Sequence, residues 1–138
     1  KTVECFEDCD IAILSAAVAD YTPKSTFDTK LKKKTDNLVV ELVPTKDILA
    51  ELGRRKKENQ ILVGFALETD NEFENAKAKL EKKNLDFIVL NSLNDKGAGF
   101  NVSTNKVTIL DAKGNVYNSD LKSKYEVALD ISEKILGL

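Results

Sequence analysis

The sequence predicts an α/β protein with a Rossmann-like, three-layer fold: a mainly parallel sheet with a β-hairpin extension. Short apolar runs alternate along the chain with segments of helical periodicity, which is typical of βαβ units. The apolar runs have the length and residue types of buried strands. Near the C-terminal end, two strand-like segments flank a polar turn, which indicates a hairpin.

The first half of the chain predicts two strands and one helix. Residues 10–15 are a short apolar run that ends in small residues, as expected of a buried strand. Residues 20–34 are polar and lysine-rich and predict a long loop. The β-branched residues 37–43 predict a second strand, and Pro44-Thr45 then opens a helix that runs to about Lys57.

The second half continues the alternation. Residues 61–66 predict a buried strand, and Thr69-Asp70-Asn71-Glu72 has the spacing of a capping box, which predicts a helix start. In the helix predicted over residues 71–83, the apolar face consists of Phe73, Ala76 and Leu80. Residues 86–90 predict a third buried strand.

A hairpin and a final helix complete the predicted fold. Residues 106–110 and 116–117 form the two hairpin strands around a turn at 111–114. The last helix covers about residues 122–136, and its apolar positions at helical spacing are Val127, Ile131 and Ile135.

Composition excludes several classes of function. The 138 residues favour one domain, and 42% of them are hydrophobic, enough for a sizeable core. A net charge of -2 argues against nucleic-acid binding. Because the chain has no histidine, it contains no Ser–His or Cys–His catalytic pair. No apolar run is long enough to cross a bilayer and no secretory leader is present, so we expect a cytoplasmic protein.

Two further features concern the N-terminal end. The chain begins at Lys1 and contains no methionine, so we expect it to be a fragment that lacks upstream sequence. Cys5 and Cys9 lie four residues apart. They could pair or bind a metal, but reduced thiols without a role are the expected state.

Ligands of parallel sheets bind beyond the carboxyl ends of the strands, so candidate functional residues are expected there. Residues 15–21 offer small side chains that let a ligand approach the backbone, and Asp20 could hold magnesium or a sugar or base donor. The alternative is a packed strand end with a loop or capping Asp. Lysines fill four of the five positions 30–34 and could close over a polyphosphate, or form an ordinary solvated surface.

Three other positions carry similar alternatives. Residues 45–49 form a strand-to-helix turn whose free N–H groups suit a phosphate, although Thr45 could be a simple N-cap. Lys79 and Lys83 lie on one side of their helix and could hold phosphate, or be surface lysines. Phe65 could stack on a base, or pack in the core.

Taken in order, these segments resemble one family, the bacterial phosphopantothenoylcysteine synthetases, also called phosphopantothenate–cysteine ligases. This module is commonly the C-terminal part of a bifunctional coenzyme A biosynthesis flavoprotein. The most specific segment is Ala-Ala-Val-Ala-Asp, followed about ten residues later by the lysine-rich flap. The resemblance rests on residues 15–21, 30–33, 46–49, 64–69, 79–86, Asn91 and 99–101.

The resemblance implies a ligase that joins 4′-phosphopantothenate to L-cysteine with CTP and magnesium. The carboxylate would form an acyl-cytidylate and release pyrophosphate, and the cysteine amine would then displace CMP. Flavin mononucleotide would belong only to a fused decarboxylase domain. The resemblance also implies a homodimer, with residues 107–116 or 37–43 at its interface.

Residue roles follow from the same resemblance. Lys30 matches the catalytic lysine, and Asp20 is the candidate metal ligand. Lys46 stands where many relatives have proline. The implied nucleotide-binding residues are Ser15, Ala16, Ala17, Asp20, Lys30, Lys46, Asp47, Ile48, Leu49, Phe65, Lys79 and Lys83.

One departure from the family pattern is clear. The family's upstream strand with its glycine-rich turn, and an asparagine that helps hold the intermediate, have no counterpart here. We therefore expect residues 1–138 to be a single ligase domain without that N-terminal part. Two rival functions are a non-catalytic or redox Rossmann-like nucleotide-binding domain and an interaction scaffold. The phosphate-loop motifs G-x-G-x-x-G and G-x-x-x-x-G-K-[ST] do not occur in the chain.

Overall fold

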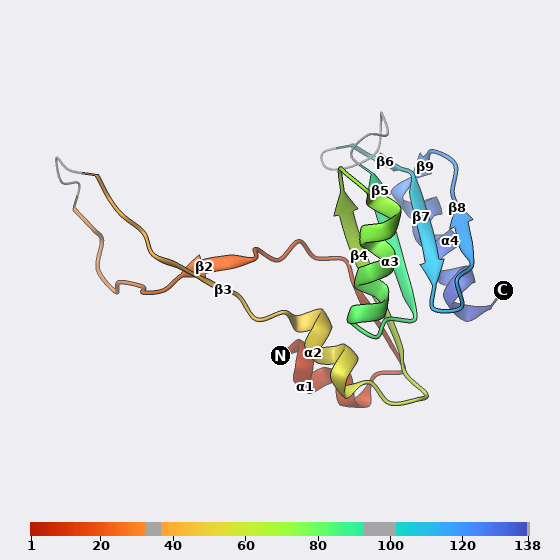
Figure 1. The fold of residues 1–138 in the computed structure, drawn as a ribbon, viewed down its shortest axis with the longest axis horizontal. Helices are drawn as coiled ribbons and strands as arrows, with labels where there is room; N and C mark the ends of the chain where they lie inside the picture. The colour runs from red at the N-terminus through yellow and green to blue at the C-terminus, as the bar shows by residue number, and fades with distance from the viewer. Residues whose placement is uncertain (33–36, 93–101, 138) are drawn as a thin grey trace. The chain divides into compact units, whose positions relative to one another are not determined.

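The computed structural model describes residues 1–32, 37–92 and 102–137. It divides into two compact units (Figure 1). The first unit comprises Lys1–Ala16 and Ile48–Leu138, and the second comprises Ala17–Asp47. No helix among the described residues combines the length and apolarity that a bilayer crossing requires.

The first unit is built on a five-stranded sheet with the order β1-β4-β5-β7-β8. β1, β4 and β5 are parallel, whereas β7 pairs antiparallel with both β5 and β8. The strands are β1 Ile11–Leu14, β4 Ile61–Glu68, β5 Phe87–Ser92, β7 Val107–Asp111 and β8 Val116–Asn118. The predicted parallel sheet with a hairpin extension is therefore confirmed.

Helices cover both faces of this sheet and make a three-layer structure. On one face lie α1 (Thr2–Cys5), the 3-10 turn η1 (Phe6–Asp8), α2 (Ile48–Arg55) and α3 (Glu72–Lys82). The core on this face includes Phe6, Leu52, Leu62, Ala76, Leu80, Ile88 and Leu90. On the other face α4 (Lys124–Leu136) buries Val127, Ile131 and Ile135 against Val63, Val89, Val107 and Ile109.

The end of α2 is tied closely to the end of α3. The Asn84 side-chain amide donates to the Gly53 carbonyl oxygen at 2.9 Å. Asp86, just before β5, accepts from the Leu62 N–H at 2.7 Å and from the Lys56 ammonium at 2.8 Å. These bonds join both helices to β4 and β5.

A buried glutamine holds the N-terminal segment in place. Gln60 is only 4% exposed, and its Nε2 donates to the carbonyl oxygens of Phe6 and Cys9, both at 2.7 Å. Its Oε1 accepts from the Lys57 N–H at 3.0 Å. The amide therefore uses both its donor and acceptor sides, as a buried polar group should.

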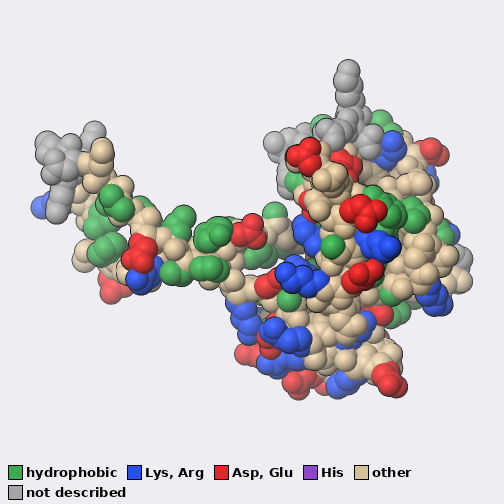
Figure 2. Space-filling view, viewed as in Figure 1, with side chains coloured by type: hydrophobic (Ala, Val, Ile, Leu, Met, Phe, Trp, Pro, Cys, Tyr) green, Lys and Arg blue, Asp and Glu red, His purple; other side chains and the backbone are tan. Residues whose placement is uncertain are grey.

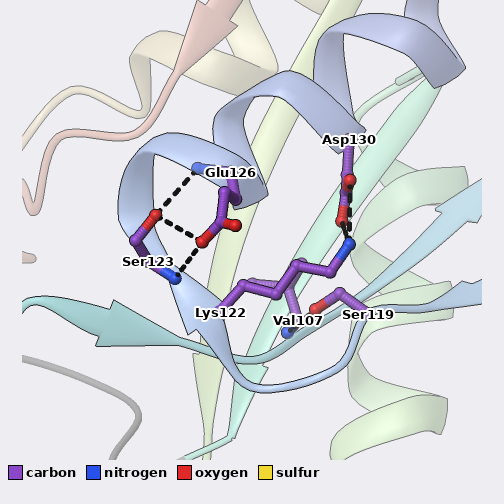
Figure 3. A network of polar contacts seen from close by, with 6 residues as sticks. All are labelled: Val107, Ser119, Lys122, Ser123, Glu126 and Asp130. Carbon is purple, nitrogen blue, oxygen red and sulfur yellow. Dashed lines mark hydrogen bonds and ion pairs between the residues drawn. The ribbon is translucent and has the colours of Figure 1, made fainter.

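The start of α4 is fixed by a capping box. The Ser123 hydroxyl accepts from the Glu126 N–H, and the Glu126 carboxylate accepts from the Ser123 N–H (Figure 3). Lys122 reaches along the helix to Asp130, with Nζ–Oδ distances of 3.1 and 2.8 Å. Lys122 and Ser123 form β9, which pairs with β6 (Thr104–Asn105).

The helix predicted over residues 71–83 is confirmed as α3, but the predicted cap is wrong. The helix begins at Glu72 with Asn71, not Thr69, as its N-cap, in the left-handed region at φ 45°. The Glu72 carboxylate accepts instead from the Ser92 hydroxyl at 2.7 Å. Glu72 thus connects α3 to the end of β5 rather than closing a capping box with Thr69.

The second unit contains a short two-stranded ribbon. β2 (Tyr21–Pro23) pairs antiparallel with β3 (Leu42–Pro44), so the strand predicted over 37–43 is shorter and lies later in the chain. The Thr45 hydroxyl donates to the Ala19 carbonyl oxygen at 2.6 Å, and its N–H donates to the Asp20 carbonyl oxygen at 2.9 Å. Because Thr45 closes this ribbon, α2 starts only at Ile48, and the predicted helix start at Pro44-Thr45 is wrong.

We predict that Gly53→Ala destabilises the protein. A Cβ at this position would lie 1.8 Å from the Lys83 carbonyl oxygen. Alanine normally stabilises a helix interior by about 1 kcal/mol relative to glycine. Here we expect a loss of about 2–3 kcal/mol from overpacking, measured by urea unfolding. Ser132→Ala, at an exposed position of α4, should change stability by less than about 0.5 kcal/mol. A more stable Gly53→Ala variant would contradict the packing described.

We also predict that Ser123→Ala makes stability less dependent on acid pH. Hydrogen bonds from the Ser123 side chain and backbone lower the pKa of Glu126 below its ordinary value of 4.5. A lowered carboxyl pKa stabilises the fold above the unfolded-state pKa, and this stabilisation is lost as pH falls through the folded-state pKa.

The variant should therefore be less stable than wild type near neutral pH, and the difference should narrow as the pH drops below 4.5. In an NMR titration, the pKa of Glu126 should rise toward its ordinary value in Ser123→Ala and stay unchanged in Ser132→Ala. An unchanged Glu126 pKa in Ser123→Ala would rule out the Ser123 hydroxyl as a cause of the lowered pKa.

Candidate functional site

The carboxyl ends of the three parallel strands define the edge at which a ligand of this fold class binds. β1 ends at Leu14, β4 at Glu68 and β5 at Ser92. Leu14 is paired with Gly64, so Ser15 leaves the sheet next to the position of Phe65. Ser15 and Ala16 are exposed, which leaves their backbone open to a ligand.

Five of the predicted site residues belong to the second unit. Ala17, Asp20, Lys30, Lys46 and Asp47 are all exposed. The backbone of Asp20 is held by Thr45, which leaves its carboxylate side chain on the surface. Of the lysine-rich flap, Lys33 and Lys34 lie outside the described residues. The convergence of Lys30 with the lysines of α3 stays a prediction.

At the start of α2, backbone N–H groups are more available to a ligand than side chains are. Ile48 and Leu49 are partly buried and pack against the core of the first unit. Their side chains are therefore engaged in packing, whereas the N–H groups of the first turn of an α-helix lack intrahelical partners. An anion at this turn would also be favoured by the helix dipole.

Lys79 and Lys83 lie on α3 and at its C-cap. The Lys79 ammonium forms an ion pair with the carboxylate of Glu68, the last residue of β4. The Glu68 side chain is 13% exposed and that of Lys79 is 45% exposed. Lys79 is thus held at the ligand edge, whereas the backbone of Lys83 lies beside Gly53, at the far end of α3.

Phe65 lies on the opposite face of the sheet from α3. Its side chain is half-buried and packs with Ile61, Val63 and Val89 on the α4 face. Core packing, one of the two alternatives for Phe65, therefore describes its side chain. The structure does not bring Phe65 and the α3 lysines onto one face, and a ligand that touches both must reach over the edge of the sheet.

A polar cavity of about 330 Å³ lies on the α3 face of the same edge. Glu72, Ser92 and Lys106 line it, together with Thr108 and Asn118. The Thr108 hydroxyl donates to Asn118 Oδ1 at 2.8 Å. Sequence reasoning missed this cavity, because its residues come from a helix start, a strand end and a hairpin. Their only sequence signal was that Ser92 follows a buried strand.

The described residues contain no group of three or more Cys, Asp or Glu side chains that could hold a metal ion. Cys5 and Cys9 are free thiols, and the Cys9 thiol donates to the Cys5 carbonyl oxygen at 3.2 Å. A Mg²⁺ ion bound by these residues would therefore depend on single carboxylates, completed by ligand oxygens and water.

Comparison with known proteins matches residues 1–138 to the DNA/pantothenate metabolism flavoprotein C-terminal domain. A "Cysteine/Cysteine sulfinic acid decarboxylase" from an unknown prokaryotic organism is 59% identical over 99% of this chain and 38% of its own length. The "Coenzyme A biosynthesis bifunctional protein CoaBC" of Bacillus subtilis (strain 168) is 47% identical over 96% of this chain and 32% of its own length.

A solved structure, the C-terminal domain of a CoaBC protein, superposes with a TM-score of 0.76 at 37% identity. The match covers 97% of this chain and 57% of that structure's chain. The present chain spans less than two fifths of the curated relatives described above.

We predict that Glu68→Gln strengthens the binding of inorganic triphosphate. Glu68 competes with any phosphate for the Lys79 ammonium, so its removal should lower the Kd several-fold at low salt. Glu74→Gln, on an exposed position of α3, changes the net charge equally and should have a smaller effect. Calorimetric titration of both variants checks this, and equal effects would show that Glu68 acts only through net charge.

Proposed function

The chain belongs to the DNA/pantothenate metabolism flavoprotein C-terminal domain family, and from that premise we propose that it is the ligase part of a coenzyme A biosynthesis protein. In this proposal it joins 4′-phosphopantothenate to L-cysteine, using CTP as the activating substrate. The observation that carries the proposal is the full-length match to the C-terminal part of CoaBC proteins, in sequence and in fold.

The proposed reaction has two steps. A carboxylate oxygen of phosphopantothenate attacks the α-phosphorus of CTP, a P–O bond forms, and pyrophosphate leaves as the α–β bond breaks. The amine of cysteine then attacks the acyl carbon, a C–N bond forms, a proton is lost from nitrogen, and CMP leaves. Both steps need positive charge and exclusion of water, and neither needs a histidine.

The cationic residues of the chain suit the first step. We propose that Lys30 is the catalytic lysine, which stabilises the charge that develops on pyrophosphate. Lys79 and Lys83 would bind the triphosphate together with backbone N–H groups at Ile48 and Leu49. Ser15, Ala16 and Ala17 would line the nucleotide through their backbone, with Lys46, Asp47 and Phe65 as further contacts.

Magnesium fits this scheme through Asp20. A single exposed carboxylate is enough when the triphosphate and water supply the remaining ligands. The ion, when bound, neutralises phosphate charge.

A homodimer is part of the proposal and is supported by the surface of the second unit. Figure 2 shows hydrophobic side chains gathered along this unit. Each of these side chains is at least 52% exposed: Val18, Tyr21, Phe27, Leu31, Leu38, Val39, Val40 and Leu42. An isolated two-stranded ribbon is marginally stable in water, and this one has strands of only three residues. A second copy that covers these side chains would supply the missing burial.

The relative named as a decarboxylase supports a second candidate only weakly. This chain covers 38% of that protein, so its printed activity need not reside in the matched part. A redox Rossmann-like domain remains the other alternative. CTP with magnesium should raise the Tm of the full-length protein, whereas NAD or NADP should not, and the opposite result would favour the redox alternative.

The proposed function predicts that Lys30→Gln slows pyrophosphate release. In the full-length protein with CTP, magnesium and phosphopantothenate, we expect a fall of about 10²–10³-fold in kcat, the usual loss for one transition-state donor. Lys124→Gln, at an exposed position of α4, makes the same charge change and should keep wild-type activity. Full activity of Lys30→Gln would remove Lys30 from the catalytic role.

A further inference from the structure

Two buried amide oxygens on asparagine side chains lack hydrogen-bond partners among the described residues. They are Oδ1 of Asn91 and Oδ1 of Asn105. Most buried polar atoms in folded proteins are hydrogen-bonded, so an unpaired one needs an explanation. A functional ligand that supplies the missing donors would be such an explanation.

Both residues lie at the ligand edge of the sheet. Asn91 is next to last in β5, where its neighbours across the strands are Leu67 of β4 and Val107 of β7. Because side chains alternate along a strand, Asn91 shares the α4 face with Val89 and Phe65. Asn105 ends β6, two residues before Val107, which is the cross-strand partner of Asn91.

The backbone around these side chains is firmly held. The Val107 N–H donates to the Ser119 hydroxyl at 2.9 Å (Figure 3). β6 pairs with β9, whose Ser123 caps α4, and the Lys124 N–H donates to the Ser103 carbonyl oxygen at 3.0 Å. These bonds hold the backbone of β6 and of the start of β7 in place around the two amides.

The surroundings of these acceptors favour an uncharged ligand group. A phosphate would be repelled by carbonyl oxygens, and the lysines of α3 lie on the other face of the sheet. Lys122, the cross-strand partner of Asn105, is already paired with the carboxylate of Asp130. Phe65 and Leu67 provide apolar surface beside Asn91. The group that fits is planar or apolar and carries N–H or O–H donors.

We propose that Asn91 and Asn105 are specificity-determining residues that accept hydrogen bonds from an uncharged N–H or O–H donor of a bound substrate. This inference rests on the proposed function and deepens it. Two substrates carry such chemistry: the exocyclic amine of the cytosine base, and the amide and hydroxyl groups of the pantothenoyl chain. The lysines would hold the phosphates, and the two asparagines would select the neutral part.

The test uses Asn91→Leu and Asn105→Leu in the full-length protein. Leucine keeps a similar volume and removes the acceptor. We expect at least one variant to raise the Kd of CTP or of phosphopantothenate about tenfold or more, with Tm unchanged or higher, because replacing an unpaired buried amide need not destabilise. Asn59→Leu, at an exposed position of the turn before β4, should bind both substrates as wild type does.

The two binding measurements distinguish the sources of the donor. A weaker CTP complex, with a reduced preference for CTP over UTP, assigns the amides to the base. A weaker phosphopantothenate complex assigns them to the pantothenoyl chain.

Other outcomes overturn the inference. The inference is overturned if both variants bind both substrates with the Kd of the wild-type protein. If the Tm of these variants also falls, the two amides stabilise the fold rather than bind a substrate. If the wild-type protein binds neither substrate, the proposed function fails and takes this inference with it. If the wild-type protein binds both substrates and the two variants bind them equally well, only this inference fails and the proposed function stands.

Discussion

The close approach of α2 to α3 is the constraint on which the rest of the first unit depends. Gly53 lets the two helices meet at the Lys83 carbonyl group, and Asn84 bridges them. Asp86 joins the same junction to β4 and β5 through the Leu62 N–H and the Lys56 ammonium. These contacts lie at the amino-terminal end of β5 and hold α2 and α3 side by side on one face of the sheet. The opposite edge, where the strands end, is left free for chemistry.

The two faces of the sheet give that free edge two different characters. On the α3 face lie charged and hydroxyl groups: the Lys79–Glu68 ion pair, Glu72, Ser92 and Lys106. On the α4 face lie Phe65, Leu67 and the amide of Asn91. A substrate with a charged end and a neutral end can be oriented by such a division, because each end loses favourable contacts when the molecule is reversed.

Sequence reasoning succeeded where a hydrophobic period had enough length to be unambiguous. β4, β5, the hairpin and α4 follow from buried runs and from Val127, Ile131 and Ile135. It failed where short polar signals compete. Thr45 could cap a helix but closes a ribbon, and Glu72 could complete a capping box but accepts from Ser92. The candidate site was predicted as a set of strand ends and stays a prediction. The pairing of Lys79 with Glu68 and the unpaired oxygens of Asn91 and Asn105 depend on tertiary contacts, which one-dimensional patterns do not encode.

The hydrogen bonds of the buried Gln60 determine where this domain can be cut without loss of structure. Gln60 holds the carbonyl groups of Phe6 and Cys9 from inside the protein, and Phe6 is 2% exposed in the core beside Leu52. The first nine residues are thus an integral part of the folded first unit rather than a dispensable tail. A boundary drawn at Asp10, just before β1, would leave the Gln60 amide without the two carbonyl acceptors and would remove Phe6 from the core next to Leu52. Truncated or chimaeric versions of this domain should therefore keep residues 1–9 together with β1.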